Sequence, residues 1–122
     1  MGLRVLIVDD ALFMRNMLKD VFLKAGYEVI GEAADGIEAV ELYRRLRPDL
    51  VTMDIVMPRK SGIEALQEIC AEHPEARIVM CSAMGQEALI LEAVQAGARD
   101  FIVKPFKEDK VLEVVRRIAG QV

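Results

Sequence analysis

The chain has few of the residues that build disulfide frameworks or zinc sites. Its two cysteines are Cys70 and Cys81, and its one histidine is His73. They form no CxxC pattern and no Cys and His set with metal-ligand spacing, which argues against both kinds of site. Neither cysteine has a partner base in the sequence that would activate a thiol. We therefore expect both cysteines to be structural and His73 to lie at a helix end without a catalytic role.

Long apolar runs and long basic runs are also missing. No stretch approaches the roughly 20 apolar residues that cross a bilayer. The N-terminus lacks the succession of basic, apolar and small residues that marks a signal peptide. We therefore expect a cytoplasmic protein with no membrane contact. The formal net charge of -4 argues against nucleic acid as a direct partner, because duplex binding depends on phosphate neutralisation by Lys and Arg.

The length and the apolar content favour one well-buried domain. A chain of 122 residues can build one substantial hydrophobic core but not two, so we expect a single domain over residues 1–122. The hydrophobic fraction of 53% is ordinary for a globular protein. The positive mean hydropathy suggests strands that are buried on both faces.

Apolar strand patterns alternate with helix-periodic stretches five times along the chain. Strands are expected at residues 3–8, 27–32, 50–53, 77–82 and 100–103. The first helix should end at Gly26, and the others should cover about 35–47, 61–73, 86–95 and 108–119. This alternation is typical of an α/β fold, a doubly wound parallel sheet with five helices packed on its faces.

Two helix starts and two helix faces can be specified further. The patterns Asp35-Gly-Ile-Glu38 and Ser61-Gly-Ile-Glu64 resemble capping boxes. Residues with helical spacing predict the buried faces of the first and fifth helices: Met14, Met17, Leu18 and Val21 in the first, and Val111, Val114, Val115 and Ile118 in the fifth.

Polar residues gather where the predicted strands end. Asp9 and Asp10 follow the first strand, and Asp54 follows the third. Ser82 closes the fourth strand, and Lys104 follows the fifth. Ligands of open α/β sheets bind beyond the carboxyl ends of the strands, where the strand order reverses. We therefore expect these five side chains to meet at one edge of the sheet.

The chemistry of this set points to magnesium and to phosphoryl transfer. Three carboxylates and one ammonium leave a surplus of two negative charges, and Mg²⁺ suits such a partial shell of oxygen ligands. Asp54 suggests itself as the phosphoryl acceptor, because a carboxylate is already ionised at neutral pH and needs no general base. Lys104 would supply a second positive charge for the phosphoryl group.

Each of these residues also has a simpler interpretation. Asp10 alone could be the N-cap of the first helix. Lys104 could be a solvated residue in a turn before Pro105, and Ser82 could be a small polar strand terminus. Their joint placement at successive strand ends favours a common site, because unrelated caps and turns have no reason to supply ligands, nucleophile and counter-cation to one edge.

These residues resemble the receiver domain of two-component response regulators, and the resemblance covers the whole chain. It rests on VLIVDD at 5–10, MDIVMP at 53–58 with Ser61-Gly62, CSA at 81–83 and FIVKPF at 101–106. The chain is most similar to the small stand-alone chemotaxis regulators of the CheY type. The resemblance implies a flavodoxin-like sheet with the strand order 2-1-3-4-5.

The resemblance implies roles for the acidic residues. Asp54 would be phosphorylated by the phosphohistidine of a histidine kinase. Asp9, Asp10 and Asp54 would hold Mg²⁺ together with the backbone carbonyl of Val56. The side chain of Val56 also stands where this family tunes dephosphorylation, and here it is apolar.

It also implies roles at the fourth and fifth strands. Ser82 and Lys104 would contact the phosphoryl group, and Phe101 stands where the family has an aromatic residue that turns inward on activation. Phe101 replaces the tyrosine of many chemotaxis members, so the switch must act through shape. The peptide bond to Pro105 should be cis. Met84, like Val56, stands at a position that tunes dephosphorylation and is apolar.

The expected output is binding to another protein. The surface at about residues 86–119 should change on phosphorylation, and the family suggests the flagellar motor switch protein as its partner. We expect a monomeric regulatory protein that is not an enzyme, although it assists its own phosphorylation and dephosphorylation, and a separate phosphatase is an expected partner. A phosphorelay intermediate that passes phosphate to a histidine phosphotransferase would share the same site, as would a receiver excised from a longer DNA-binding regulator.

Two other classes of protein are less compatible with the residues. A flavodoxin-like electron carrier needs a phosphate-binding loop rich in Ser, Thr and Gly after the first strand, where this chain has carboxylates. A magnesium phosphohydrolase with an aspartate nucleophile would have Asp-x-Asp spacing there, whereas Asp9 and Asp10 are contiguous. Flavin colour would favour the electron carrier, and turnover of phosphate esters would favour the phosphohydrolase.

Overall fold

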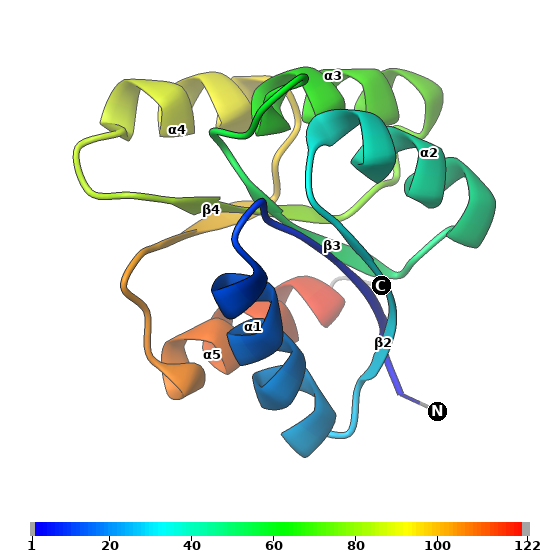
Figure 1. Cartoon of the computed structure of the whole chain (residues 1–122), viewed down its shortest axis with the longest axis vertical. Helices are drawn as coiled ribbons and strands as arrows, with labels where there is room; N and C mark the ends of the chain where they lie inside the picture. Colours follow the sequence, from blue (N-terminus) through cyan, green and yellow to red (C-terminus); the bar gives the residue numbers. More distant parts are fainter. Residues whose placement is uncertain (1, 121–122) are drawn as a thin grey trace.

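The computed structural model describes residues 2–120, which form a parallel sheet between two layers of helices (Figure 1). The strands are β1 (Arg4–Val8), β2 (Glu28–Ala33), β3 (Leu50–Asp54), β4 (Ile78–Ser82) and β5 (Asp100–Val103). They lie in the order β2-β1-β3-β4-β5, and every pair is parallel. The order reverses between β1 and β3, so the predicted doubly wound flavodoxin-like fold is confirmed. Each strand begins and ends within one residue of its predicted range.

The helices divide between the two faces of the sheet (Figure 1). They are α1 (Leu12–Lys24), α2 (Gly36–Leu46), α3 (Gly62–Glu72), α4 (Glu87–Gln95) and α5 (Glu108–Ala119). One core cluster joins the sheet to α1 and α5, and the other joins it to α2, α3 and α4. None of the helices within residues 2–120 is long and apolar enough to cross a membrane.

Burial on both faces is limited to the centre of the sheet. β3 and β4 are buried throughout, and β1 is buried after Arg4. The edge strands β2 and β5 are mostly half-buried or exposed. The prediction of strands buried on both faces is therefore wrong for these two, because an edge strand lies where the helix layers end.

The predicted helix faces are confirmed in α5 and only in part in α1. All four apolar residues expected to be buried in α5 are buried. In α1, Leu18 and Val21 are buried, but Met14 and Met17 are only partly buried and Phe22 is buried instead. The stripe at 18, 21 and 22 still has helical spacing. It lies closer to the C-terminal end of α1 than predicted, because the rest of the protein covers the start of this helix less.

The two predicted capping boxes differ in the structure. At α3, the Glu64 N–H donates to Ser61 Oγ and the Ser61 N–H donates to Glu64 Oε1, both at 3.1 Å, so the box is complete. At α2, the Glu38 N–H donates to Asp35 Oδ1 at 2.9 Å. The Glu38 side chain accepts from the Ala34 N–H instead of the Asp35 N–H. Asp35 is therefore the N-cap of α2, but the Glu38 side chain bonds to the backbone of Ala34, one residue before the N-cap.

Candidate functional site

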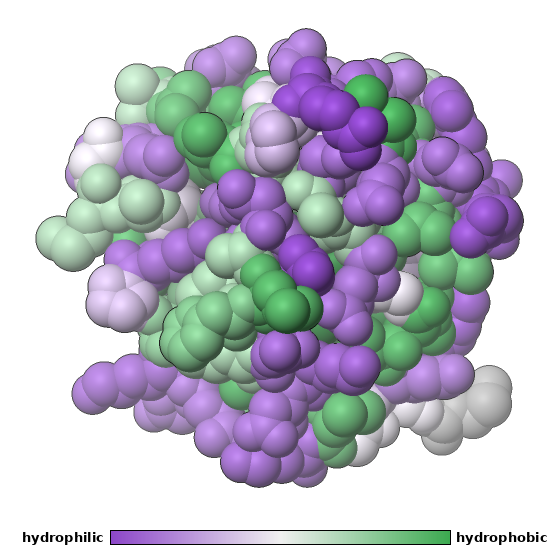
Figure 2. All heavy atoms as spheres, in the orientation of Figure 1, coloured by the Kyte–Doolittle hydropathy of each residue, from purple (hydrophilic) through white to green (hydrophobic). Residues whose placement is uncertain are grey.

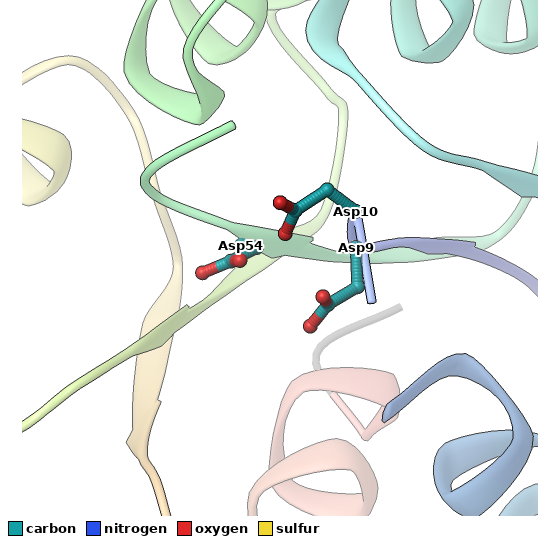
Figure 3. Close-up of side chains that lie close together, drawn as sticks. All are labelled: Asp9, Asp10 and Asp54. Carbon is teal, nitrogen blue, oxygen red and sulfur yellow. The ribbon is translucent and has the colours of Figure 1, made fainter. Parts of the chain in front are cut away.

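Three carboxylates lie together where β1 and β3 end. Asp9 and Asp10 follow β1, and Asp54 is the last residue of β3. Each offers an oxygen that lies within 4.8 Å of an oxygen from each of the other two. Figure 3 shows the three side chains leaving adjacent strand ends and reaching into the same space. The sheet topology thus brings together residues that are up to 45 positions apart in the sequence.

Lys104 lies beside two of these carboxylates. Its Nζ is 2.9 Å from Asp9 Oδ2 and 3.4 Å from Asp54 Oδ1. Asp9 is only 1% exposed, and its other oxygen accepts from the Ala11 N–H at 2.9 Å. The interpretation of Lys104 as a solvated turn residue is therefore wrong, because its ammonium group is the counter-charge of a buried carboxylate.

Asp10 is the exposed member of the cluster. The N-cap of α1 is Ala11, and α1 begins at Leu12 without a side-chain cap. The Asp10 side chain makes no hydrogen bond or ion pair with any residue in the range 2–120. The alternative interpretation of Asp10 as a helix cap is therefore wrong, because the helix begins one residue too late for it. Both Asp10 oxygens are available to a ligand.

The site perturbs the acidity of its central carboxyl group. Burial, together with repulsion from Asp9 and Asp10, raises the pKa of Asp54 from 3.8 to about 6, although Lys104 opposes the shift. Burial also disfavours the charged form of Lys104. The hydrogen bond from Lys104 to Asp9 and the charges of Asp54 and Asp9 outweigh this effect and raise the pKa of the lysine. Asp54 is thus mostly ionised at neutral pH beside a protonated lysine.

The remaining predicted residues lie on β4 and β5 or directly after β5. Ser82 is fully buried, and its Oγ has no hydrogen-bond partner among residues 2–120. The Ser82 carbonyl accepts from the Lys104 N–H at 2.7 Å, and the bond between Lys104 and Pro105 is cis, the isomer that the resemblance implies. Phe101 is 38% exposed and lines a groove of about 420 Å³ that also contains Met84. Phe101 therefore points outward beside an open groove.

Comparison with known proteins decides the family. The model of the response regulator receiver domain matches residues 5–116. This chain belongs to the receiver-domain family. The receiver is 60% identical over 119 residues to the chemotaxis protein CheY of Thermotoga maritima, covering 98% of this chain and 99% of that protein. It is 57% identical over 117 residues to CheY of Bacillus subtilis, covering 96% and 98% of the two chains.

Solved structures agree with this assignment. A CheY chain in the crystal structure of a CheX-CheY-BeF3-Mg complex from Borrelia burgdorferi is 42% identical, with a TM-score of 0.92 and coverage of 95% of this chain and 88% of that chain. The response regulator domain of Thermotoga maritima CheB is 40% identical, with a TM-score of 0.90 and coverage of 98% of both chains. The predicted family, its place in two-component signalling and its likeness to chemotaxis regulators are thereby confirmed.

Exposed apolar side chains flank the acidic cluster of the receiver. Leu12 and Phe13 lie at the start of α1, with Phe13 73% exposed. Val56 follows β3, and Met84, which precedes α4, is 79% exposed. Figure 2 shows hydrophobic side chains over the start of α1 and over the loop before α4, with hydrophilic side chains between them. The positions predicted to tune dephosphorylation are thus both exposed and apolar in this receiver.

The loop from β3 to α3 is held against α2 by contacts that the sequence patterns did not reveal. Arg59 has a φ of 67° and forms an ion pair with Asp35, the buried N-cap of α2. The Gly36 N–H donates to the Lys60 carbonyl at 3.0 Å. These contacts fix the loop that carries the Val56 carbonyl. A cap motif identified Asp35 in the sequence, but nothing in the sequence pattern pairs it with Arg59.

The raised pKa of Asp54 predicts a pH dependence of folding stability. Between pH 3.8 and about 6 the folded receiver binds more protons than the unfolded chain at this group, so Asp54 destabilises the fold progressively as pH rises through this window. The loss approaches about 3 kcal/mol above pH 6, at about 1.4 kcal/mol per pKa unit. The stability gained by Asp54→Asn should therefore grow from pH 4 to pH 7 in urea unfolding without metal. A gain that does not change with pH would contradict the shift, and exposed Asp20→Asn is the control.

Proposed function

We propose that this receiver is a phosphorylation-activated switch in which Asp54 accepts a phosphoryl group from a histidine kinase. A carboxylate oxygen of Asp54 attacks phosphorus, the P–N bond of phosphohistidine breaks, and the imidazole takes up a proton from solvent. The observation that carries the proposal is the position of Asp54, the last residue of β3, with Lys104 Nζ 3.4 Å from its Oδ1 and two further carboxylates beside it. Lys104 balances the charge of the phosphoryl oxygens as they approach.

We infer further that the ion of this site is Mg²⁺. Carboxylate oxygens are the hard donors that Mg²⁺ prefers, and Asp10 has no competing partner within the described chain. Asp9, Asp10 and Asp54 would hold the ion together with the Val56 carbonyl. When bound, Mg²⁺ neutralises the carboxylates and the phosphoryl oxygens. The related CheY structure contains Mg and BeF3, which supports this proposal.

The proposed switch runs through the ends of β4 and β5. Ser82 has a buried hydroxyl without a described partner, so a phosphoryl oxygen on Asp54 would give it one. Because the Ser82 carbonyl already binds the Lys104 N–H, a shift of Ser82 moves the end of β5 with it. Phe101, on β5, can then leave its exposed position for the neighbouring groove. The surface at about residues 86–119 would change as a result.

We propose the flagellar motor switch protein as the output partner and a phosphatase as a second partner. Identities of 57–60% to chemotaxis proteins over nearly the whole chain support this choice over the phosphorelay alternative. On this proposal the receiver is a cytoplasmic monomer that catalyses no reaction beyond its own phosphorylation and dephosphorylation. A pull-down with and without BeF3 tests the output. If BeF3 increases the amount of motor-switch protein that is recovered, the proposal is supported. If BeF3 instead increases the recovery of a histidine phosphotransferase, the result favours a relay.

Lys104→Ala is expected to leave phosphorylation of Asp54 detectable but to abolish the gain in partner binding. The ammonium group is the side chain at the end of β5 that contacts the Asp54 carboxylate directly, and without it the backbone bond from Lys104 to Ser82 should not transmit the change by itself. Phosphorylation is followed on a phosphate-affinity gel, and partner binding by pull-down. Lys107→Ala, at the exposed N-cap of α5, is the control. Normal partner binding by phosphorylated Lys104→Ala would contradict the switching role.

Met84→Gln and Met84→Glu are expected to shorten the lifetime of the phosphorylated form about tenfold, which corresponds to about 1.4 kcal/mol of barrier. An apolar side chain at this exposed position shields the acyl phosphate and cannot orient water, whereas an amide or carboxylate can. Release of phosphate from the purified phosphorylated receiver is timed. Met84→Leu keeps the apolar character and similar volume and should change little. Equal lifetimes for all variants would reject the role of Met84.

A further inference from the structure

Asp10 is oriented by its backbone alone. Its side chain has no partner among residues 2–120, whereas Asp9 is held by Lys104 and by the Ala11 N–H. If the backbone rotated freely at this turn, the Asp10 carboxylate would point in many directions. It would then spend less time in the position from which it can bind a metal ion. Backbone bonds hold the chain on both sides, from the Asp9 N–H to the Ala33 carbonyl and from the Met14 and Arg15 N–H groups to the Ala11 carbonyl, but none of them holds the peptide between Asp9 and Asp10.

Arg15 makes the contact that does this. It lies on α1 with its side chain only 16% exposed. Its Nη1 donates to the Asp9 carbonyl at 2.7 Å, and its Nε donates to Glu32 Oε1 on β2 at 3.2 Å. We propose that Arg15 is a positioning residue that, by holding the Asp9 carbonyl, sets the direction in which Asp10 presents its carboxylate to the metal. This inference rests on the proposed magnesium-dependent function.

The geometry explains how Arg15 acts through Asp10. A peptide unit is planar, so holding the Asp9 carbonyl also fixes the nitrogen and Cα of Asp10. On the other side, the Ala11 N–H bonds to Asp9 Oδ1 at 2.9 Å. The Cα of Asp10 is therefore bracketed by two hydrogen bonds that both end on Asp9. A guanidinium suits this role because its rigid fork can donate to a carbonyl and to a carboxylate at once.

The chain offers a matched control for charge. Glu32 also pairs with Lys19, whose Nζ lies 3.4 Å from Glu32 Oε2 and whose side chain is 45% exposed. Lys19 lies one helical turn after Arg15, carries the same charge and shares the same partner, but it makes no described contact with Asp9. A difference between Arg15→Ala and Lys19→Ala therefore reports the contact with the Asp9 carbonyl rather than the loss of one positive charge near Glu32.

Calorimetric titration with Mg²⁺ alone tests the proposal. Arg15→Ala should weaken Mg²⁺ binding about tenfold, as removal of outer-shell partners of metal ligands does, and Lys19→Ala should stay within about twofold of wild type. In metal-free protein, the Ala11 amide should exchange its hydrogen faster in Arg15→Ala than in Lys19→Ala. Arg15→Lys, which retains one donor group, should be intermediate, and it keeps the test in place if Arg15→Ala does not fold.

A double-mutant cycle with Asp10 gives the sharpest outcome. If Arg15 acts by orienting Asp10, then Arg15→Ala should cause little further loss of Mg²⁺ affinity in an Asp10→Asn background. The same tenfold loss in both backgrounds, or a folded Arg15→Ala variant with wild-type affinity, would overturn the positioning role. Wild-type protein that binds no Mg²⁺ would overturn the proposed function itself, which is a different result from normal wild-type binding with an unaffected variant.

Discussion

Asp54→Asn is expected to abolish phosphorylation of the receiver while leaving its fold intact. The amide oxygen of asparagine carries no negative charge, so it is a poor nucleophile toward phosphorus. The neighbouring carboxylates are poorly placed to replace it. Asp9 is buried with its two oxygens bound to Lys104 and to the Ala11 N–H. Asp10 stands on a different strand end and lacks the adjacent lysine. Loss should therefore be complete rather than partial.

A phosphate-affinity gel measures this loss after incubation with a histidine kinase and ATP, or with a small acyl phosphate as donor. Asp10→Asn keeps the nucleophile but removes a proposed metal ligand, so this variant should be phosphorylated more slowly. Its phosphorylated band should still be detectable at high Mg²⁺. Asp20→Asn, on the exposed side of α1, should behave as wild type. A phosphorylated band that persists in Asp54→Asn at the wild-type level would show that another residue is the acceptor.

Most of the fold follows from local patterns in the sequence. The three central strands are apolar runs bounded by polar residues, α2 and α3 carry start signals, and a glycine follows the end of α1. Gly26 adopts a φ of 84° directly after the C-cap of α1, and Ser61 forms the complete capping box of α3. Signals of this kind depend on residues within one turn of each other, so they can be read without knowledge of the packing.

The meeting of the site residues could also be predicted, because it follows from topology rather than from side-chain packing. Parallel strands all end at one edge, and Asp9, Asp54 and Lys104 each stand at or directly after a strand end. The strand order itself came from the family resemblance. The motifs that carry that resemblance are the same strand-end residues, which is why fold and site were predicted together.

What the sequence did not reveal are contacts between side chains far apart in the chain. Arg15 and Glu32 are 17 positions apart, and Asp35 and Arg59 are 24 apart. Whether such pairs meet depends on how α1 and the β3-to-α3 loop lie on the sheet, and no periodicity records that. The partial exposure of Met14 and Met17 has the same origin. Helical spacing identifies a face, but the placement of the helix decides which part of that face is covered.

Gly62→Ala is expected to destabilise the receiver by about 3 kcal/mol or more and to disturb the end of β3. A Cβ at position 62 would lie 1.9 Å from the Asp54 carbonyl oxygen and 2.9 Å from its carbon. The Gly62 N–H donates to the Ile55 carbonyl at 2.7 Å, so the loop closes directly onto the end of β3. Because both neighbours are backbone, no side-chain rotation can relieve the overlap. Either the end of β3 or the start of α3 must move, and Asp54 lies on the first of these.

Urea unfolding without metal and calorimetric titration with Mg²⁺ together measure these two consequences. Gly26→Ala is the control for backbone conformation, because its φ is 84° but the space around it is open, and it should lose about 1 kcal/mol. Ser61→Ala removes the cap hydroxyl from the same turn without adding volume and should also lose about 1 kcal/mol. Both controls should keep wild-type Mg²⁺ affinity, whereas Gly62→Ala should lose affinity as well as stability. A Gly62→Ala variant no less stable than these controls would mean that the loop relaxes freely, and the position of Asp54 would then not depend on this close contact.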